Sequence, residues 1–220
     1  SISSTVSANT TSGFSIVKFT ANGSNNGTIG HGLGSTPAIV IYKRLDGTGP
    51  WYVLYTFVDG SQDYLILDST AAKADLASST YGTATSSTIS NIGLTNNHSM
   101  LAYCFSDVQG FSKMGSYTGN GSTNGTFIYT GFKPAFVMIK SSSSAQSWSI
   151  LDIKRDVNPN AKVLWPNDNY AEYDETQGVD FLSNGFKNNE SGDGFNGSGA
   201  SYIYMAFAEA PLVGTNNVPC

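Results

Sequence analysis

Residues 37–42 have the sequence Pro-Ala-Ile-Val-Ile-Tyr, and residues 134–139 have the closely similar sequence Pro-Ala-Phe-Val-Met-Ile. In both stretches a proline precedes a run of apolar residues that no polar residue interrupts. Uninterrupted apolar residues indicate a strand that is covered on both faces, and a proline at strand entry removes no ladder hydrogen bond. The two stretches therefore predict two central β-strands.

Other segments recur in the same order at nearly the same spacing of 97 or 98 residues. They pair Gly13-Phe14-Ser15 with Gly110-Phe111-Ser112, Phe19–Ser24 with Tyr117–Ser122, Trp51 with Trp148, and, near the end of each copy, Leu101-Ala102-Tyr103 with Met205-Ala206-Phe207. Such recurrence indicates two copies of one unit of about 100 residues, which is the usual size of a small β-sandwich.

The composition favours strands over helices. The 220 residues include 24 Gly, 12 Phe, 12 Tyr and 3 Trp, 40% are hydrophobic and only 12% are charged. Abundant Gly, Ser, Thr and Asn disfavour long helices, whereas aromatic residues are good strand formers. We therefore expect an all-β protein made of two tandem, homologous antiparallel β-sandwich (jelly-roll-like) repeats with long loops and little helix.

Each copy shows the same succession of expected strands. They span 14–20, 38–42, 51–57 and 100–105 in the first copy, and 111–118, 135–139, 148–153 and 202–207 in the second. Asn22-Gly23 and Asn120-Gly121 are hairpin candidates because Asn and Gly accept positive φ. We expect one or two helical turns at most, in the Ala-rich segment 68–76.

These features suggest four segments along the chain. Residues 1–12 are an N-terminal linker or a strand of an upstream region, residues 13–108 are the first repeat, residues 109–212 are the second, and residues 213–220 are a tail. Because the chain begins at Ser1 rather than Met, we expect a fragment or a processed product.

The charge balance excludes some partner classes. The net charge is −5 and no basic stripe is present, so we expect neither nucleic-acid binding nor attraction to anionic membranes. No apolar run is long enough to span a membrane as a helix. Cys104 and Cys220 cannot form a disulfide framework, and we expect Cys104 to be a small core residue.

Catalytic motifs are absent from the sequence. Only His31 and His98 could serve a histidine-based triad or metal site, and both are expected to be turn or surface residues. No nucleophile elbow, phosphate-binding glycine loop or zincin motif occurs. We therefore expect no enzyme activity, no cofactor and no metal.

Carboxylates concentrate in the second copy, most of them in segment 168–180. They are Asp152, Asp156, Asp168, Glu172, Asp174, Glu175 and Asp180. We interpret this segment first as a solvated acidic loop, second as a calcium site, to which the loop 192–197 bears a weak resemblance, and third as the acid pair of a polysaccharide depolymerase, with Asp174, Glu175 and Asp180 as its residues.

Aromatic residues supply the candidate binding site. Trp51 and Trp148 match between the copies, so we expect a shared core role. Trp165, Tyr170 and Tyr173 instead lie in a polar, turn-rich segment, where exposed rings can stack on the apolar faces of sugars. With Asn167 and Asp168 as hydrogen-bonding neighbours, they form the candidate contact for a glycan or a partner protein.

Longer strings resemble a known kind of module. They are Gly13–Val17, Gly30–Gly34 and Ala102–Phe105 in the first copy, and Gly115–Gly121, Tyr129–Lys140, Leu182–Lys187 and Tyr202–Glu209 in the second. Together they resemble a duplicated C-terminal module of tail-fibre-like and virion structural proteins from tailed phages, notably those of marine bacteria. The family supplies no catalytic or binding residues that could be transferred to this chain.

The resemblance implies a non-enzymatic virion component on the surface of a phage particle, of the tail-fibre or receptor-binding type. A capsid decoration or head-fibre protein that contacts only other virion proteins is the alternative, and a depolymerase is the third. The expected partners are copies of the chain itself, with a trimer favoured, other virion proteins, and a glycan or protein of the host surface.

Overall fold

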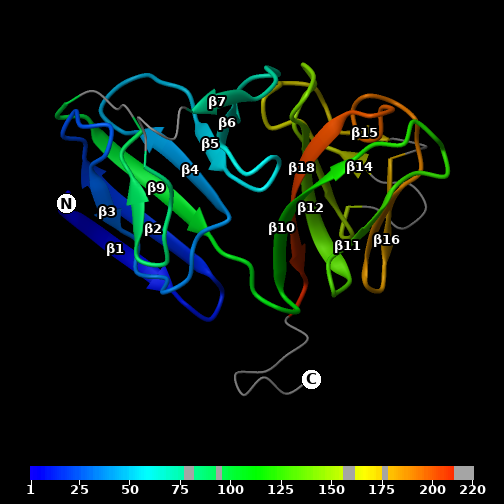
Figure 1. Cartoon of the computed structure of the whole chain (residues 1–220). Helices are drawn as coiled ribbons and strands as arrows, with labels where there is room; N and C mark the ends of the chain where they lie inside the picture. The colour runs from blue at the N-terminus through cyan, green and yellow to red at the C-terminus, as the bar shows by residue number, and fades with distance from the viewer. Residues whose placement is uncertain (77–81, 93–95, 156–161, 175–177, 211–220) are drawn as a thin grey trace. The chain divides into compact units, whose positions relative to one another are not determined.

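The computed structural model describes residues 1–76, 82–92, 96–155, 162–174 and 178–210. The described residues form strands, turns and loops and contain no helix. The contacts divide the chain into two compact units (Figure 1). The first comprises Ser1–Ile66 and Ala74–Asp107, and the second comprises Leu67–Lys73 and Val108–Cys220.

The first unit contains a seven-stranded antiparallel sheet with the order β1-β2-β9-β4-β5-β6-β7, and a two-stranded sheet of β3 and β8. Its strands are β1 (Ser4–Asn9), β2 (Phe14–Thr20), β3 (Thr28–Gly30), β4 (Ile39–Arg44), β5 (Tyr52–Tyr55), β6 (Gln62–Ile66), β7 (Ala74–Leu76), β8 (Thr88–Ser90) and β9 (Ser99–Phe105).

The core of this unit lies between its two sheets. Val17, Tyr42 and Ala102 from the large sheet belong to one buried cluster with Ile29 and Ile89 from the small sheet. Strand β2 alternates buried and more exposed positions, whereas the apolar part of β4 is buried throughout. Since β4 lies between β9 and β5, the prediction of a central strand is confirmed.

The second unit contains the four-stranded sheet β10-β18-β12-β13, the three-stranded sheet β11-β17-β16 and the pair β14-β15. Its strands are β10 (Ser112–Thr118), β11 (Phe127–Tyr129), β12 (Pro134–Ser141), β13 (Ser149–Asp152), β14 (Lys162–Val163), β15 (Tyr173–Asp174), β16 (Val179–Leu182), β17 (Gly185–Asn188) and β18 (Ser201–Ala208). Val137, Tyr202, Ile128 and Phe186 bring the two larger sheets together in one core.

Strands that match in sequence occupy matching places in their sheets. The order β2-β9-β4-β5 in the first unit corresponds to β10-β18-β12-β13 in the second, and the pair β3-β8 corresponds to β11-β17. The expected all-β fold of antiparallel sheets is therefore present, with the apolar runs at the centre.

The hairpin prediction is wrong for both Asn-Gly sequences. Gly23 and Gly121 do take positive φ, at 73° and 65°. Strand β2, however, pairs with β1 and β9, while β3 pairs with β8. In the second unit β10 pairs with β18, and β11 pairs with β17. The turns therefore carry the chain from one sheet to the other instead of folding it back on itself.

Strand pairing tests both the N-terminal alternatives and the helical prediction. Residues 4–9 pair with residues 14–19 of β2, so of the two alternatives for segment 1–12 a strand, and not a linker, is present at these residues. The expected helical turns in segment 68–76 are absent, and Ala74–Leu76 pairs with β6 as β7. The tail 213–220 lies outside the described residues, and no helix among those described could cross a membrane.

Two side-chain placements differ from expectation. Trp148 is buried, but Trp51 is only partly covered and stacks on Tyr103 with ring centroids 6.3 Å apart. The shared core role is thus wrong for Trp51. His31 lies in a loop, as expected, but its side chain is fully buried. Cys104 is a buried free thiol of the first core, as predicted.

Candidate functional site

A groove of about 670 Å³ in the second unit gathers the predicted aromatic residues. Trp165, Tyr170 and Tyr173 all line it. The other lining residues come from three separate segments, and they are Gln146, Ser147, Ser149, Ala171, Glu172, Glu190, Gly192, Gly194 and Phe195. The groove therefore depends on the folded sandwich and not on a single loop.

The three rings are arranged around Trp165. The Trp165 and Tyr170 centroids lie 6.0 Å apart with nearly perpendicular planes, and Tyr173 lies 6.0 Å from Trp165 at a tilt of 38°. Tyr170 and Tyr173 are 69% and 53% exposed, whereas Trp165 is partly buried against the core. Trp165 thus anchors two tyrosine rings that remain open to solvent.

Local hydrogen bonds fix the position of Trp165. The preceding residue, Leu164, exchanges backbone hydrogen bonds of 3.0 and 2.8 Å with Ile150 near the start of β13. The Asp168 N–H then donates to the Trp165 carbonyl at 3.0 Å and closes a turn through Pro166. A proline inside such a turn restricts φ, so the aromatic residue enters the groove from a rigid segment.

Asn167 and Asp168 take a different role from the one predicted. The Asn167 Oδ1 accepts a 2.7 Å hydrogen bond from the Trp148 backbone N–H, and its Nδ2 donates to Ser147 Oγ at 3.2 Å. Ser147 Oγ also donates to Asp168 Oδ2 at 3.2 Å. Neither residue lines the groove. Their side chains hold the turn against the start of β13, so a glycan contact through them is not supported.

Part of the lining comes from residues that the sequence did not indicate as a binding site. Glu190, Gly192, Gly194 and Phe195 come from the loop between β17 and β18, and a Cβ at Gly192 or Gly194 would lie 3.6 or 3.9 Å from Glu190 Oε1. Phe195 is 5% exposed, and its carbonyl accepts a 2.7 Å hydrogen bond from the Tyr117 hydroxyl. The sequence indicated only a weak resemblance of this loop to a calcium turn. Its aromatic residue, Phe195, is the feature that could have indicated a place in the groove.

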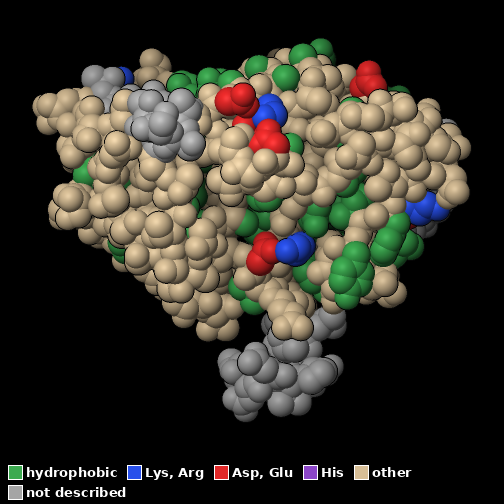
Figure 2. Space-filling view, in the orientation of Figure 1, with side chains coloured by type: hydrophobic (Ala, Val, Ile, Leu, Met, Phe, Trp, Pro, Cys, Tyr) green, Lys and Arg blue, Asp and Glu red, His purple; other side chains and the backbone are tan. Residues whose placement is uncertain are grey.

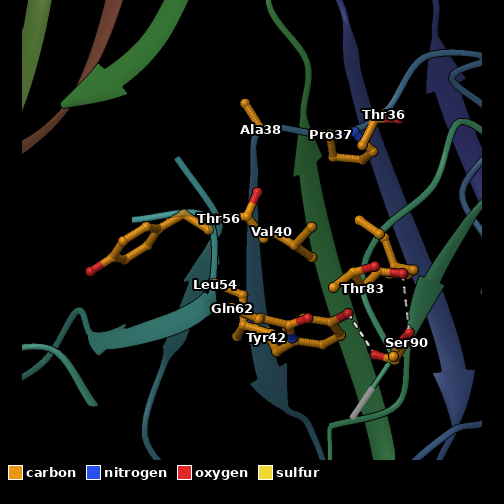
Figure 3. A pocket seen from close by; sticks show the side chains of 15 residues that line it. Thr36, Pro37, Ala38, Val40, Tyr42, Leu54, Thr56, Gln62, Thr83 and Ser90 are labelled. Carbon is orange, nitrogen blue, oxygen red and sulfur yellow. Dashed lines mark hydrogen bonds between the residues drawn. The ribbon is translucent and has the colours of Figure 1, made fainter. Parts of the chain in front are cut away.

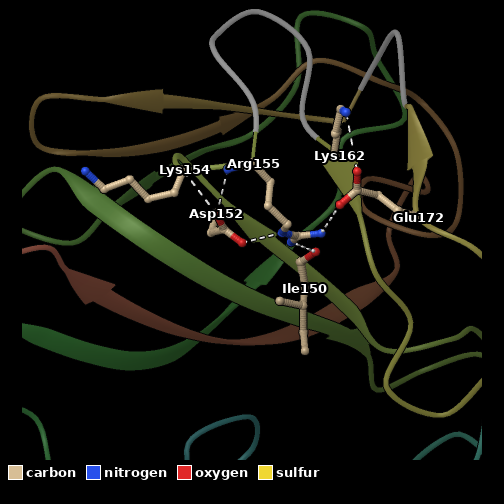
Figure 4. A network of polar contacts seen from close by, with 6 residues as sticks. All are labelled: Ile150, Asp152, Lys154, Arg155, Lys162 and Glu172. Carbon is tan, nitrogen blue, oxygen red and sulfur yellow. Dashed lines mark hydrogen bonds and ion pairs between the residues drawn. The ribbon is translucent and has the colours of Figure 1, made fainter.

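An ion-pair network supports the tyrosine side of the groove (Figure 4). Arg155 binds Asp152 through Nε, donates from Nη1 to Glu172 at 3.2 Å, and donates from Nη2 to the Ile150 carbonyl at 3.0 Å. Lys162 Nζ lies 3.3 Å from the other oxygen of Glu172. Glu172, which precedes Tyr173 in the sequence, thus forms ion pairs with both Arg155 and Lys162.

The charge state of Asp152 follows from the same network. Burial by itself would raise the pKa of this carboxyl, but the Arg155 guanidinium and the backbone N–H groups of Lys154 and Arg155 outweigh it. The pKa consequently lies below its ordinary value. An ionised Asp152 at neutral pH can hold Arg155 but cannot serve as a general acid.

The acidic segment does not converge on an ion site in the part described. Asp156 and Glu175 lie outside the described residues, while Asp180 accepts a 3.0 Å hydrogen bond from Asn189. Within the described ranges, the group of three carboxylates within 4.8 Å of one another is Asp59, Asp63 and Asp75 of the first unit. The calcium and acid-pair interpretations of segment 168–180 gain no support from this geometry.

The loop 192–197 is organised by hydrogen bonds within the protein. The Asp193 carbonyl accepts from the Tyr202 hydroxyl at 2.8 Å, and that hydroxyl accepts from the Gly197 N–H at 2.8 Å. Burial raises the pKa of Tyr202 above its ordinary value, so the hydroxyl keeps its proton. These bonds to Tyr202 hold the loop against the core.

The charged side chains that line the groove are Glu172 and Glu190, and Glu172 is paired with Arg155 and Lys162. Figure 2 shows a face of the molecule on which Lys, Arg, Asp and Glu side chains are few and scattered among uncharged groups. Aromatic rings stack on apolar C–H faces, and amide, hydroxyl and carboxylate groups bond to hydroxyls. Rings beside Gln146, Ser147 and Glu190 can therefore bind a ligand that combines both kinds of surface.

The fold and the groove together define a class: an all-β protein whose second unit presents an exposed aromatic groove. More specifically, the chain belongs to the family described as Domain of unknown function (DUF7483), whose model matches residues 1–211. Neither a curated protein nor a solved structure matches the chain.

Proposed function

We propose that this chain is a non-enzymatic fibre module of a phage particle that binds a glycan of the host surface in the groove around Trp165. The observation that carries the proposal is the grouping of Tyr170 and Tyr173, both more than half exposed, on the partly buried Trp165. Exposed tyrosines cost free energy in water, and a stacked ligand removes that cost.

The groove suits carbohydrate better than other ligand classes. Its volume of about 670 Å³ falls within the usual range for ligand sites, and its lining mixes rings with amide, hydroxyl and carboxylate groups. The net charge of −5 argues against phosphate-rich partners. A neutral oligosaccharide of a few residues would contact the tyrosine faces and the polar groups of Gln146 and Ser147 at once.

The particle-level part of the proposal depends on sequence resemblance. The strings that resemble those of tail-fibre-like proteins support a place on the surface of the virion, as part of a homo-oligomer in which a trimer is favoured. A surface rich in hydroxyl and amide groups suits an extracellular fibre, since it offers many hydrogen bonds to sugars. In this proposal the module holds or displays the contact with the host cell.

The experiment is a glycan array followed by calorimetry with the best-binding oligosaccharide. We expect Tyr170→Ala and Tyr173→Ala each to weaken binding about tenfold or more, equivalent to about 1.4 kcal/mol. Tyr129→Ala is the matched control, because Tyr129 is 66% exposed in the same unit but does not line the groove. Blank arrays and blank cell-binding assays, or equal losses in all three variants, would contradict the proposal.

A second candidate function depends on a separate patch. Phe127 and Tyr129 on the edge strand β11 are 44% and 66% exposed, and Leu182 on β16 is 37% exposed. Tyr129 and Leu182 both lie opposite Gly185, so they share one row across the small sheet. Exposed apolar residues that lie together favour contact with another protein, as a decoration or fibre-scaffolding role requires.

Imaging and solution mass separate the two candidates. If the module serves only virion contacts, Phe127→Asp should abolish incorporation into particles or shift the oligomer towards monomer in light scattering. The groove variants should then behave like wild type in both measurements. If the module is the glycan binder, the groove variants should lose cell binding while particle incorporation persists.

A further inference from the structure

A second cavity, of about 260 Å³, lies within the first unit and is not part of the aromatic groove. It opens beside the small sheet, between strands β4, β5 and β6 and the segment that leads into β8 (Figure 3). Its walls include Val40, Tyr42, Leu54, Gln62, Thr83 and Ser90. The cavity therefore enters the sandwich from its side and reaches the edge of the core.

Gln62 is the feature that distinguishes this cavity. The side chain lines it and is only 4% exposed, and its Oε1 has no hydrogen-bond partner among the described residues. A buried amide oxygen without a donor is destabilising, and most such atoms in folded proteins are satisfied by protein or by a bound molecule. The oxygen thus provides a free acceptor inside a cavity.

The neighbouring polar groups are already hydrogen-bonded to one another. The Tyr42 hydroxyl donates to the Ser90 carbonyl at 2.8 Å, and Ser90 Oγ donates to the Thr83 carbonyl at 3.4 Å. Both bonds are drawn in Figure 3. They join the sheet to the facing segment and make that wall rigid. A molecule that enters would meet fixed surfaces with one acceptor open to it.

The lining also sets the charge of the ligand. Among the described residues that line it there is no Lys, Arg, His, Asp or Glu, and burial raises the pKa of Tyr42 well above its ordinary value, which keeps that hydroxyl neutral. An ionic ligand would have to leave water without a counter-charge, which is unfavourable. Threonine hydroxyls at positions 36, 56 and 83 add neutral donors and acceptors.

We infer that this cavity binds a small neutral polyhydroxylated molecule, of the size of one sugar residue, with a ligand hydroxyl donating to Gln62 Oε1. The volume corresponds to about nine water molecules at their liquid density. The apolar side of such a ring would lie on Val40 and Leu54, and its remaining hydroxyls would face the threonines. This inference stands on Gln62 and does not depend on the aromatic groove.

The test is a titration of the ¹⁵N-labelled chain with single sugars: glucose, galactose, mannose, rhamnose and N-acetylglucosamine. Concentrations up to about 20 mM would detect a dissociation constant near 1 mM, which is the weak end of specific binding. We expect at least one sugar to shift the backbone amides of Gly60, Thr83 and Ser90. Gln62→Met keeps the length of the side chain but removes its acceptor, and should weaken that binding about tenfold or more.

Two further variants make the result decisive. Gln146→Met is the matched control, because the same change is made in the aromatic groove and should leave the shifts of the first unit unchanged. Thr56→Arg fills the mouth from an exposed position, so it keeps the test valid if Gln62→Met folds poorly.

The inference is overturned if no sugar shifts these amides, or if Gln62→Met and Thr56→Arg bind as wild type does. It would be overturned equally if Gln146→Met abolished the same shifts, since the binding would then belong to the groove. Loss of oligosaccharide binding in Tyr170→Ala tests the proposed function separately, because Tyr170 does not line this cavity.

Discussion

Asn196 and Asn120 are joined by two reciprocal hydrogen bonds in the second unit. Asn196 Nδ2 donates to Asn120 Oδ1 at 2.7 Å, and the Asn120 backbone N–H donates to Asn196 Oδ1 at 3.0 Å. Asn120 Oδ1 also accepts from the Ser122 N–H at 3.0 Å, which forms an Asx turn. A buried amide thereby fixes the turn at which the chain leaves one sheet for the other.

The first unit contains a corresponding arrangement. Asn91 Nδ2 donates to the Ser24 carbonyl at 2.7 Å and to Asn22 Oδ1 at 3.4 Å, and Asn22 Oδ1 accepts from the Ser24 N–H at 3.0 Å. Both Asn91 and Asn196 are fully buried. Each crossover turn therefore depends on an asparagine from a distant part of its unit.

We predict that Asn196→Ala destabilises the second unit by about 3 kcal/mol. The substitution removes the three hydrogen bonds that the buried Asn196 amide donates, to Asn120 Oδ1 and to the Ser122 and Glu190 carbonyls, and each contributes about 0.5–1.5 kcal/mol net. Thermal or chemical unfolding measures the loss. Asn184→Ala, at an exposed turn position, is the control and should change stability little. Equal stability of the two variants would show that the Asn196 bonds contribute nothing net.

The sequence predicted strands well because their signal is local. The apolar runs at 39–42 and 135–139 determine burial on both faces wherever the chain folds, and both became central strands. The Asn-Gly sequences specify only a positive φ and hence a turn. Whether the next strand pairs with the last one depends on long-range partners such as Asn91 and Asn196, which no local pattern contains.

The candidate site was predictable in part for the same reason. Trp165, Tyr170 and Tyr173 lie within nine residues of each other, so a polar segment dense in aromatic residues was sufficient to indicate them. Another part of the lining comes from a loop about 20 residues further along, and its approach is a property of the sandwich. Asn167 Oδ1 accepts a hydrogen bond from the Trp148 N–H, which lies 19 residues away in sequence, and no local pattern indicates such a contact.

We predict that Gly185→Ala destabilises the second unit by about 2–3 kcal/mol. A Cβ at position 185 would lie 2.1 Å from the Ile128 carbonyl oxygen, and a backbone atom in the adjacent strand cannot rotate away as a side chain can. Gly30→Ala is the matched control, since its Cβ would meet no atom within 4 Å and should change stability by less than about 0.5 kcal/mol. Similar melting temperatures for the two variants would contradict the close approach of β11 to β17.

We predict that His31 makes the first unit less stable in mild acid. His31 Nε2 lies 3.1 Å from the Thr85 carbonyl and must carry the proton, while Nδ1 accepts from the Leu33 N–H at 3.3 Å. Burial lowers the pKa of the ring below 6.5, and the Thr85 carbonyl opposes this only in part. As the pH falls through 6.5 the unfolded chain binds the proton first, so stability is lost from there down to the folded pKa.

His31→Gln is the variant that isolates this effect, because glutamine can still donate to Thr85 but does not titrate. The free energies of unfolding of both proteins are measured between pH 8 and pH 5. We expect the wild type to fall more steeply, by at most about 1.4 kcal/mol per pH unit. Carboxylates titrate alike in both proteins and cancel in the difference, so parallel curves would be evidence against a buried neutral His31.

Lys140 should produce a dependence of the same sign at higher pH. Its side chain is fully buried, and Nζ donates to the carbonyls of Ser141 at 2.7 Å, Thr70 at 3.2 Å and Ser144 at 3.4 Å, all within the second unit. No carboxylate takes part in these bonds, and burial lowers the pKa of Lys140 from 10.5 to about 8. Between these values the unfolded chain binds more protons than the folded one, so this group makes the protein more stable as the pH rises.

We therefore predict that the stability of the wild type relative to Lys140→Met increases from pH 8 to pH 10, by up to about 1.4 kcal/mol per pH unit. Comparison with the variant is essential because Cys104 acts in the opposite direction. Burial raises the pKa of that thiol from 9.0 to about 12, so the unfolded chain loses its proton first and stability falls above pH 9. The thiol is present in both proteins and cancels. A stability difference that stays constant with pH would mean that Lys140 exchanges its proton with solvent as an exposed lysine does, and that the three carbonyls do not enclose it in solution.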